Sequence, residues 1–354
     1  MRIAIGTRKG LWMARGDQQV WTASQPLKQM AEFASVAWVP MGTDRGPRLL
    51  VGARSWFWGP SVLSSDDDGM TWSEPASGAL VFPAEAAAAV ERVWNLTPDP
   101  RVLGRVWAGV EPHSLWRSDD GGTTFALNEP LWDHPHRADW VPGAGGPAVH
   151  TIIPRPDAGM VIAMSTGGVY RSIDSESGWE PANAGITVSF APDPYPEYGQ
   201  CVHRIAMDTQ DPDRLYAQNH GGVFRSEDAG MSWQPITEGL PSDFGFVVLA
   251  HPTRGRTAWV IPIDSETMFP PAGRLRLWRT DDAGSTWREV GEGLPNDHYA
   301  GVLRDAAHVI DLDGTAAIAF GTRNGSVYAS QDEGETFVEV ASRLPDVLSV
   351  RATA

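Results

Sequence analysis

The sequence predicts an all-β fold, a β-propeller of seven four-stranded antiparallel blades. The first observation is a stretch of the form Ser-x-Asp-x-Gly-x-Thr-Trp, which returns in six copies. Its central aspartates stand 53, 54, 54, 54 and 50 residues apart, a period typical of repeated supersecondary units. The second is the length of 354 residues, because a seventh of it, about 50 residues, suits four strands and their turns. The six aspartates are Asp67, Asp120, Asp174, Asp228, Asp282 and Asp332.

Each copy is expected to form a hairpin turn. An Asp side chain accepts hydrogen bonds from nearby backbone N–H groups, and Gly supplies a positive φ. The copy around Asp174 is degenerate, because Glu176 stands where the others have Gly. A strand-like run with an apolar or aromatic anchor precedes each copy, and a seventh run, at Trp12, has lost its turn sequence. The anchors are Trp12, Leu63, Trp116, Tyr170, Phe224, Trp278 and Tyr328.

The two ends of the chain are expected to meet in blade 1. Residues 2–6, 11–15 and 20–23 are predicted as its second, third and fourth strands, so its first strand is missing at the N-terminus. The segment 347–352 follows a Leu-Pro turn like those of two other units, and we expect it to supply that strand. This pairing would close the ring and remove two open sheet edges.

The remaining blades are expected to follow in order within a single domain of residues 1–354, in which blade 1 takes about 1–25 plus 346–353. Blade 2 is predicted to begin at Phe33 and to end at about Ala76. Between blades 2 and 3, the alanine- and glutamate-rich stretch 83–93 predicts a helix of about three turns.

Composition limits the partners and the compartment. A net charge of −16 and a pI near 4.9 argue against nucleic acid or an anionic membrane surface as a partner. No apolar run approaches the length of about 18 residues that a membrane-spanning helix needs. The N-terminal segment lacks the apolar core of a signal peptide, and the single Cys201 cannot form an internal disulfide. These features predict a cytoplasmic protein.

Long links gather on one face of the predicted ring. In a propeller, the links between blades and the links between second and third strands open on one face, and the Asp turns lie on the other. The longest links here, 129–147, 186–200 and 264–273, all fall on the first face. Because long loops on a rigid scaffold commonly carry binding and catalysis, we expect the functional site there.

Seven of the nine histidines are predicted on or beside this loop-rich face. His150 and His203 occupy matching strand starts in neighbouring blades, with His220 nearby, which indicates a metal or acid–base centre with Glu111 or Glu197 as carboxylate partner. The alternative is that these rings fill a half-polar channel and hydrogen-bond to backbone. No compact motif such as His-x-x-x-His is present, so a divalent metal is not favoured and the cofactor stays unknown. The seven are His113, His134, His136, His150, His203, His220 and His298.

Arg8, Arg54 and Arg323 lie in equivalent links of blades 1, 2 and 7, which are adjacent once the ring closes. Three guanidinium groups at one mouth would suit a carboxylate or a phosphate, because the planar fork binds two oxygens at once. The alternative is that these arginines pair with nearby aspartates and stiffen the rim.

Carboxylates complete the set of candidates. A pair of them could act as acid and base in glycoside hydrolysis, and Cys201 beside His203 could be a nucleophile, although a lone cysteine is more commonly only packed. The expected catalytic residues are Glu111, Glu197, His203 and Asp305. Besides the three arginines, the expected ligand-binding residues are His134, Trp140, His150, Tyr198, Gln200, Asn219, His220, His298 and Tyr299.

The repeated turn, clearest from Ser65 to Trp72, resembles the Asp-box or BNR repeat of sialidase-like β-propellers. The resemblance covers nearly the whole chain and implies the fold, and in that superfamily the boxes lie far from the active site. The related sialidases have six blades and an Arg-Ile-Pro motif, whereas this chain has seven units and reads Arg2-Ile3-Ala4, so no catalytic residue carries over. Seven-bladed proteins with such boxes include endo-xyloglucanase modules and a photosystem II assembly factor that binds protein.

The chain resembles bacterial proteins described as sialidase-like or BNR-repeat glycosyl hydrolases. We therefore expect a cytoplasmic protein that binds, and hydrolyses, a small polar or anionic molecule such as a sugar acid. The alternative is a non-catalytic scaffold for protein interaction or assembly. Polar side chains inside a deep mouth would favour the first function, and a flat apolar patch on the rim would favour the second.

Overall fold

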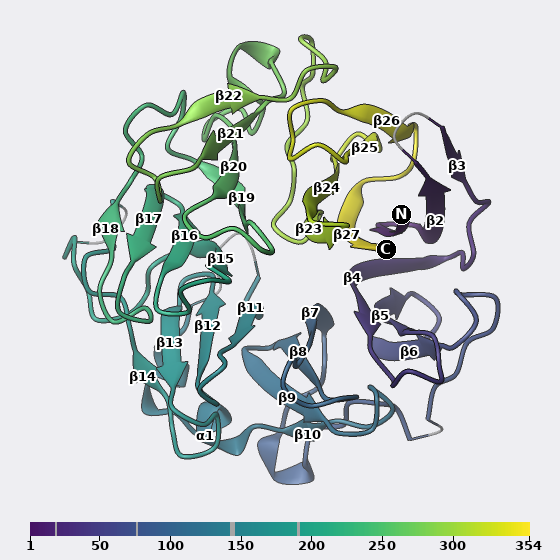
Figure 1. The fold of residues 1–354 in the computed structure, drawn as a ribbon. Coiled ribbons are helices and arrows are strands. Elements are labelled where there is room, and N and C mark those ends of the chain that lie inside the picture. Colours follow the sequence, from purple (N-terminus) through teal and green to yellow (C-terminus); the bar gives the residue numbers. More distant parts are fainter. Residues whose placement is uncertain (18–19, 76, 142–145, 190–191) are drawn as a thin grey trace.

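The structure is a computed structural model of the chain, and it describes residues 1–17, 20–75, 77–141, 146–189 and 192–354. Seven antiparallel sheets stand around a central channel as the blades of a propeller (Figure 1). Six sheets have four strands, and the sheet of blade 2 has three, with a single bridge between Ser64 and Ser73 in place of the fourth. The predicted seven-bladed fold is confirmed.

The strands of the first three blades follow the chain. Blade 1 is β27 (Val347–Thr353), β1 (Arg2–Thr7), β2 (Gly10–Gly16) and β3 (Trp21–Ala23). Blade 2 is β4 (Ala31–Val39), β5 (Arg48–Ser55) and β6 (Ser61–Ser65). Blade 3 is β7 (Arg92–Pro98), β8 (Val106–Glu111), β9 (Ser114–Ser118) and β10 (Ala126–Leu127).

The other four blades repeat this order. Blade 4 is β11 (Val149–Pro154), β12 (Met160–Met164), β13 (Gly168–Ser172) and β14 (Glu180–Pro181). Blade 5 is β15 (Val202–Met207), β16 (Leu215–Asn219), β17 (Gly222–Ser226) and β18 (Gln234–Pro235). Blade 6 is β19 (Gly245–Ala250), β20 (Ala258–Pro262), β21 (Leu277–Thr280) and β22 (Arg288–Val290), and blade 7 is β23 (Ala307–Leu312), β24 (Thr315–Gly321), β25 (Val327–Ser330) and β26 (Val338–Ala341).

The two chain ends pair in blade 1, as predicted. Strand β27 runs antiparallel to β1, with Thr353 opposite Arg2 and Val350 opposite Ile5, and the two termini lie side by side in Figure 1. The strand also reaches the next blade, because the Ser349 hydroxyl donates a hydrogen bond of 3.2 Å to the carbonyl of Phe33. The ring is therefore closed by the C-terminal strand.

The Asp turns cap the outer hairpins as expected. In blade 5, Asp228 Oδ1 accepts hydrogen bonds from the Ser232 N–H and the Ser226 hydroxyl, both at 2.8 Å. Burial raises the pKa of the Asp228 carboxyl, but these hydrogen bonds outweigh burial and hold the pKa below its usual value. The closing aromatic does more than pack under its own turn, since the Trp233 indole N–H donates to the Ala182 carbonyl of the preceding blade at 2.9 Å.

Replacement of Asp228 by Ala is expected to cost about 1 kcal/mol or more of the free energy of unfolding, because the Ser232 N–H loses its acceptor. Urea unfolding at neutral pH measures this loss. Glu238→Ala, at an exposed position in the same blade, is the control and should change stability by less than about 0.5 kcal/mol. Equal stabilities of the two variants would contradict the capping role.

The predicted helix over residues 83–93 is wrong. The structure has only a short 3-10 turn, Ala84–Ala86, and Arg92 already begins strand β7. None of the residues in that turn is buried, so high helix propensity finds no apolar face to stabilise a helix. The α-helix of the described residues lies instead at Glu129–Trp132 (α1), where the Asn128 side chain accepts a hydrogen bond from the Leu131 N–H.

In the described part of the chain, no helix is long and apolar enough to cross a membrane.

Candidate functional site at the channel mouth

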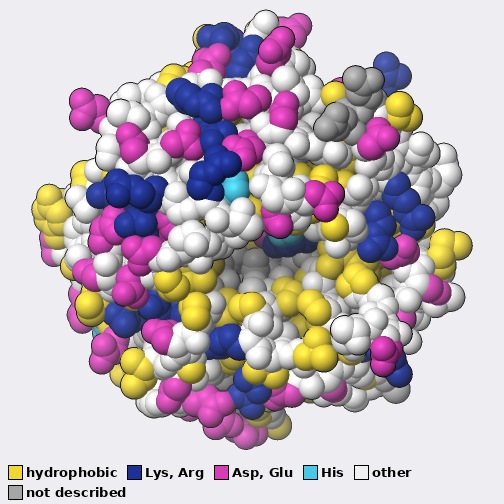
Figure 2. Space-filling model, viewed as in Figure 1, with side chains coloured by type: hydrophobic (Ala, Val, Ile, Leu, Met, Phe, Trp, Pro, Cys, Tyr) yellow, Lys and Arg dark blue, Asp and Glu magenta, His cyan; other side chains and the backbone are white. Residues whose placement is uncertain are grey.

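Polar side chains line the central channel. A cavity of about 190 Å³ lies between the inner strands of blades 1, 3, 4, 5 and 7. The channel is visible as a hollow at the centre of the face in Figure 2, with basic and histidine side chains inside it. The polar lining residues are Asn95, Thr97, His150, Thr151, Arg204, Arg304, Asp305, His308 and Arg351.

Register shifts recur near the start of the inner strands. In β7, β11 and β15 the strand pairing skips one residue, and that residue is Trp94, His150 and His203 respectively. In β19 the shift spans Phe246. A β-bulge redirects a side chain out of the regular alternation and is common beside active sites. Neighbouring blades thus present two histidines and two aromatic rings at the same level of the channel.

Arg304 is the functional candidate that the sequence did not reveal. It lies in the link before β23, and its guanidinium stands 5.5 Å from the ring centre of Trp94 and 5.6 Å from that of Phe246. Among the described residues it forms no ion pair, and its Nε is buried without a hydrogen-bond partner. Burial lowers the pKa of Arg304 to about 10, although Cys201 and Asp305 oppose the shift. A half-buried guanidinium without a carboxylate partner in the described chain suits an anionic ligand.

The two bulged histidines next to Arg304 are neutral. His203 is 2% exposed, and its Nδ1 lies 2.6 Å from the Gly245 carbonyl, which fixes Nδ1 as the protonated nitrogen. Burial and the Arg304 charge lower the pKa of His203 to about 3. The same two causes hold the pKa of His150 well below its usual value, and its Nε2 has no partner among the described residues. Both rings therefore offer lone pairs at neutral pH.

A sulfur and two ring nitrogens converge beside Arg304. One nitrogen each of His203 and His220 and the Cys201 sulfur all lie within 4.8 Å of one another. Burial raises the pKa of the Cys201 thiol, and the charge of Arg304 opposes this shift. His150 does not belong to this group, although the sequence placed it with the other two histidines.

Two buried amides lie in the same part of the fold. Gln200 donates from Nε2 to the Pro196 carbonyl at 2.6 Å, and Asn219 donates from Nδ2 to the Thr187 carbonyl at 3.4 Å. Their oxygens, Gln200 Oε1 and Asn219 Oδ1, are buried without a partner among the described residues. The two amide NH2 groups hold the link between blades 4 and 5 in place. The two amide oxygens remain as hydrogen-bond acceptors for a ligand, which agrees with a ligand-binding role.

The predicted ligand residues His134, Trp140 and Tyr198 lie instead in an interlocked cluster with Tyr170. The Trp140 indole N–H donates to the Tyr170 hydroxyl at 2.9 Å, and Tyr198 donates to Asp139 at 2.9 Å. His134 has both nitrogens occupied, Nδ1 by the His136 N–H and Nε2 by the Trp179 carbonyl, each at 3.1 Å. This cluster folds the link 129–147 onto blade 4, and residues 142–145 of that link lie outside the described residues.

The predicted catalytic carboxylates lie in different surroundings. Glu111 accepts a hydrogen bond of 2.7 Å from the Trp94 indole and so orients the ring beside Arg304. Asp305 pairs with Arg351 at 2.5 Å, deep in the channel. Glu197 is exposed, on the loop that carries Gln200. The structure thus brings Glu111 and His203 to the mouth and gives Asp305 a structural partner.

Two of the three rim arginines pair with carboxylates. Arg8 lies 3.5 Å from both Glu32 and Asp346, and Arg323 pairs with Asp346 at 3.0 Å. Arg8 and Arg54 border a surface depression of about 630 Å³ that also holds Trp56. The rim therefore carries a mixed basic and aromatic depression.

His298 and Tyr299 belong to the link between blades 6 and 7. The His298 ring faces Tyr328, with ring centres 6.4 Å apart, and the exposed Tyr299 packs edge-on against Phe269 at 5.8 Å. These contacts hold the link against the neighbouring hairpins.

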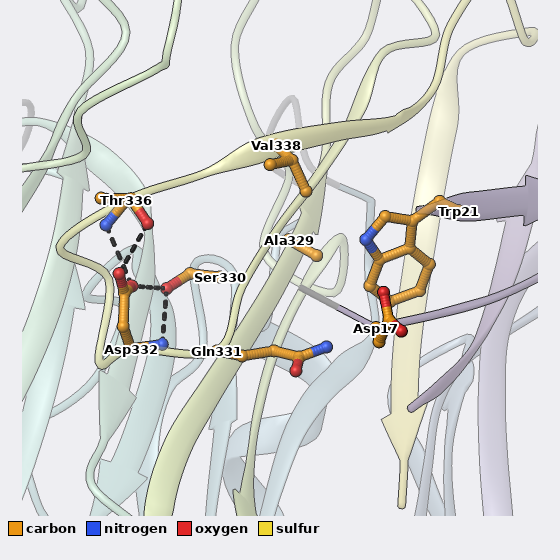
Figure 3. A pocket seen from close by; sticks show the side chains of 8 residues that line it. All are labelled: Asp17, Trp21, Ala329, Ser330, Gln331, Asp332, Thr336 and Val338. Carbon is orange, nitrogen blue, oxygen red and sulfur yellow. Dashed lines mark hydrogen bonds between the residues drawn. The ribbon is translucent and has the colours of Figure 1, made fainter. Parts of the chain in front are cut away.

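A second cavity, of about 230 Å³, lies between blades 7 and 1 and is drawn in Figure 3. Its carboxylate, Asp332, belongs to the Asp turn of blade 7. Asp332 accepts hydrogen bonds from the Ser330 hydroxyl at 2.7 Å and from the Thr336 N–H at 2.9 Å (Figure 3). Because the turn itself uses this carboxylate, we assign the cavity to the scaffold and not to ligand binding.

Comparison with known proteins gives relatives for part of the chain. A scan of family models matches none. A xyloglucanase of Paenibacillus sp is 30% identical over 236 residues, which cover 56% of this chain and 22% of the relative. An oligoxyloglucan-reducing end-specific xyloglucanase of Emericella nidulans is 25% identical over 221 residues, 59% of this chain and 26% of the relative. The matches thus take in about a quarter of each curated relative.

Solved structures share the fold over most of the chain. The periplasmic gluconolactonase of Pseudomonas aeruginosa has a TM-score of 0.58 at 15% identity, over 99% of this chain and 98% of that chain. A GH74 enzyme of Niastella koreensis has a TM-score of 0.57 at 16% identity, over 98% and 65%. YCF48 bound to a D1 peptide has a TM-score of 0.56 at 15% identity, over 93% and 85%. These comparisons support a propeller with distant xyloglucanase homologues, and the likeness to sialidases stays a resemblance of the Asp-boxes.

Proposed function

We propose that the channel mouth binds a small anionic molecule, such as a sugar acid, and that the protein hydrolyses a glycosidic bond of that molecule. The observation that carries the proposal is the Arg304 guanidinium, which is half-buried at the mouth and has no carboxylate partner among the described residues. A planar guanidinium binds a carboxylate through two parallel hydrogen bonds. The flanking rings of Trp94 and Phe246 would pack against the apolar face of a sugar.

The neighbouring groups fit hydroxyls of such a ligand. His150 Nε2 and Asn219 Oδ1 are buried acceptors that still lack partners in the described chain. Leaving a buried acceptor unpaired costs about 1–3 kcal/mol, so a ligand hydroxyl that reaches it gains this energy. The distant xyloglucanases and the fold shared with a gluconolactonase support hydrolysis, and the cytoplasmic location remains a prediction of the sequence.

Replacement of Arg304 by Met is expected to weaken the binding of D-glucuronate by about 30-fold or more, because the carboxylate loses its charged hydrogen bonds. Isothermal titration calorimetry measures the affinity, and release of methylumbelliferone from its glucuronide measures hydrolysis. Arg304→Lys keeps the charge but loses the fork, so it should recover only part of the affinity.

Arg288→Met, on the outer strand β22, is the matched control and should bind as the unaltered protein does. Arg54→Met tests the rim instead. A full loss of affinity in Arg54→Met, with none in Arg304→Met, would move the anion site from the mouth to the rim and overturn the proposal.

A second candidate, a protein-binding scaffold, is favoured by the hairpin of blade 2. Trp56 is 100% exposed and Phe57 is 77% exposed, and such aromatic side chains are enriched in protein interfaces. If the unaltered protein neither binds glucuronate nor hydrolyses the glucuronide, the scaffold function is favoured over the hydrolase function.

A further inference from the structure

Three potential metal ligands converge from two adjacent segments of blade 5. Cys201 directly precedes β15, His203 is the bulged residue of β15, and His220 follows β16. The His220 N–H donates to the Cys201 carbonyl at 2.9 Å and ties the two segments together. Cys201 and His203 are two residues apart, and residues i and i+2 of an extended segment lie on one face, which brings the two side chains to the same side.

The environment of His203 suits a metal ligand. Its Nδ1–H donates to the Gly245 carbonyl at 2.6 Å, so the lone pair is on Nε2 and the ring cannot rotate freely. Such an outer hydrogen bond on the second nitrogen is a constant feature of metal-bound histidine. Phe244 and Phe246 pack against the ring at 5.3 and 4.7 Å and limit access of water from that side.

We propose that Cys201, His203 and His220 bind one divalent transition metal ion, with zinc as the first choice. Thiolate and imidazole are the ligands zinc prefers, and three protein ligands with an open fourth position are the arrangement of catalytic zinc sites. The present spacing of up to 4.8 Å between ligand atoms has to contract by about 1 Å to give zinc–ligand bonds of about 2.0–2.3 Å, which rotation of the Cys201 and His220 side chains toward the fixed His203 ring can supply.

The open position would face the anion at Arg304. Phe246 lies against both the His203 ring and the Arg304 guanidinium, so the three ligands and the guanidinium share one end of the channel. A zinc ion there would supply a Lewis acid for an oxygen of the bound molecule. This role rests on the proposed function, whereas metal binding itself does not.

Cobalt titration tests the site. The full chain is treated with chelator, exchanged into metal-free buffer and titrated with Co²⁺ while its absorption is recorded. We expect one equivalent to bind and to produce a thiolate-to-cobalt charge-transfer band in the near ultraviolet. Because Cys201 is the single cysteine, this band reports on that residue alone. Zinc should displace the cobalt and remove the band.

Variants assign the other ligands. Cys201→Ser should abolish the band, and His203→Gln and His220→Gln should weaken cobalt binding by at least about tenfold. His150→Gln is the control, because it replaces a buried histidine of the adjacent blade outside the group. Circular dichroism checks that each variant is folded. If a variant unfolds, the cobalt absorption spectrum of the unaltered protein still shows whether the metal site exists.

Absence of the charge-transfer band in the unaltered protein would contradict the metal site. Equal cobalt affinities of His203→Gln, His220→Gln and the control His150→Gln would contradict it as well. Arg304→Met separates this proposal from the function proposed above. Suppose that Arg304→Met still binds cobalt and that the unaltered protein does not bind glucuronate. These two results together would support the metal site and contradict the anion site.

Discussion

Deletion of residues 345–354 is expected to remove most of the free energy of unfolding and to leave a chain without a cooperative thermal transition. Strand β27 is the innermost strand of blade 1 and pairs along β1 from Arg2 to Thr7. Its loss would expose the edge of β1 and remove from the core the side chains of Val347 and Val350, which are both fully buried. The ring would also lose the packing of β27 against β23 and β24 of the last blade, and a domain has only about 5–15 kcal/mol of stability to lose.

Circular dichroism and differential scanning calorimetry measure this loss. Deletion of the exposed Ala354 alone is the matched control and should leave the transition unchanged, since β27 ends at Thr353. A cooperative transition at the unaltered temperature in the longer deletion would show that the ring does not depend on β27.

Replacement of Asp305 by Ala is expected to cost about 3–5 kcal/mol, because it leaves the Arg351 guanidinium without its charge partner in the channel. The two side chains are only 10% and 11% exposed and lie 2.5 Å apart. Asp305 also accepts a hydrogen bond of 3.4 Å from Asn95, so it joins blades 7, 1 and 3 across the channel. Urea unfolding measures the change.

The double variant Asp305→Asn/Arg351→Met is the control. Removal of both charges should recover about 1 kcal/mol or more relative to Asp305→Ala, because no unpaired charge remains buried. A catalytic Asp305 would behave differently: Asp305→Ala would keep its stability and lose hydrolysis. That result would restore Asp305 to the catalytic set predicted from the sequence.

The helix predicted over residues 83–93 shows where local signals mislead. Alanine and glutamate favour helix in isolation, but a short helix in water needs an apolar face that packs. The neighbouring Val93 is buried and belongs to β7, and tertiary pairing with β8 overrides the local preference. Blade 2 likewise departs from the expected four strands, because its fourth strand is reduced to the single bridge between Ser64 and Ser73.

The structure brings only some of the predicted site residues together. His203 and His220 lie close to each other, as expected from their matching positions at the inner end of a blade, because the repeat fixes which positions face the channel. His134, Trp140 and Tyr198 were expected at the mouth from their place on long links, yet these links fold back onto blade 4. The course of a long link depends on what its side chains can pack against, which spacing does not reveal.

The sequence by itself determined the number of blades, the turns that cap them and the closure of the ring by the C-terminal strand. These features follow from short-range chemistry repeated at a constant period, so each copy confirms the others. Only the tertiary structure decided which charges meet in the channel. Asp305 pairs with Arg351 while its neighbour Arg304 contacts two aromatic rings, because the turn before β23 directs these adjacent side chains to different surroundings.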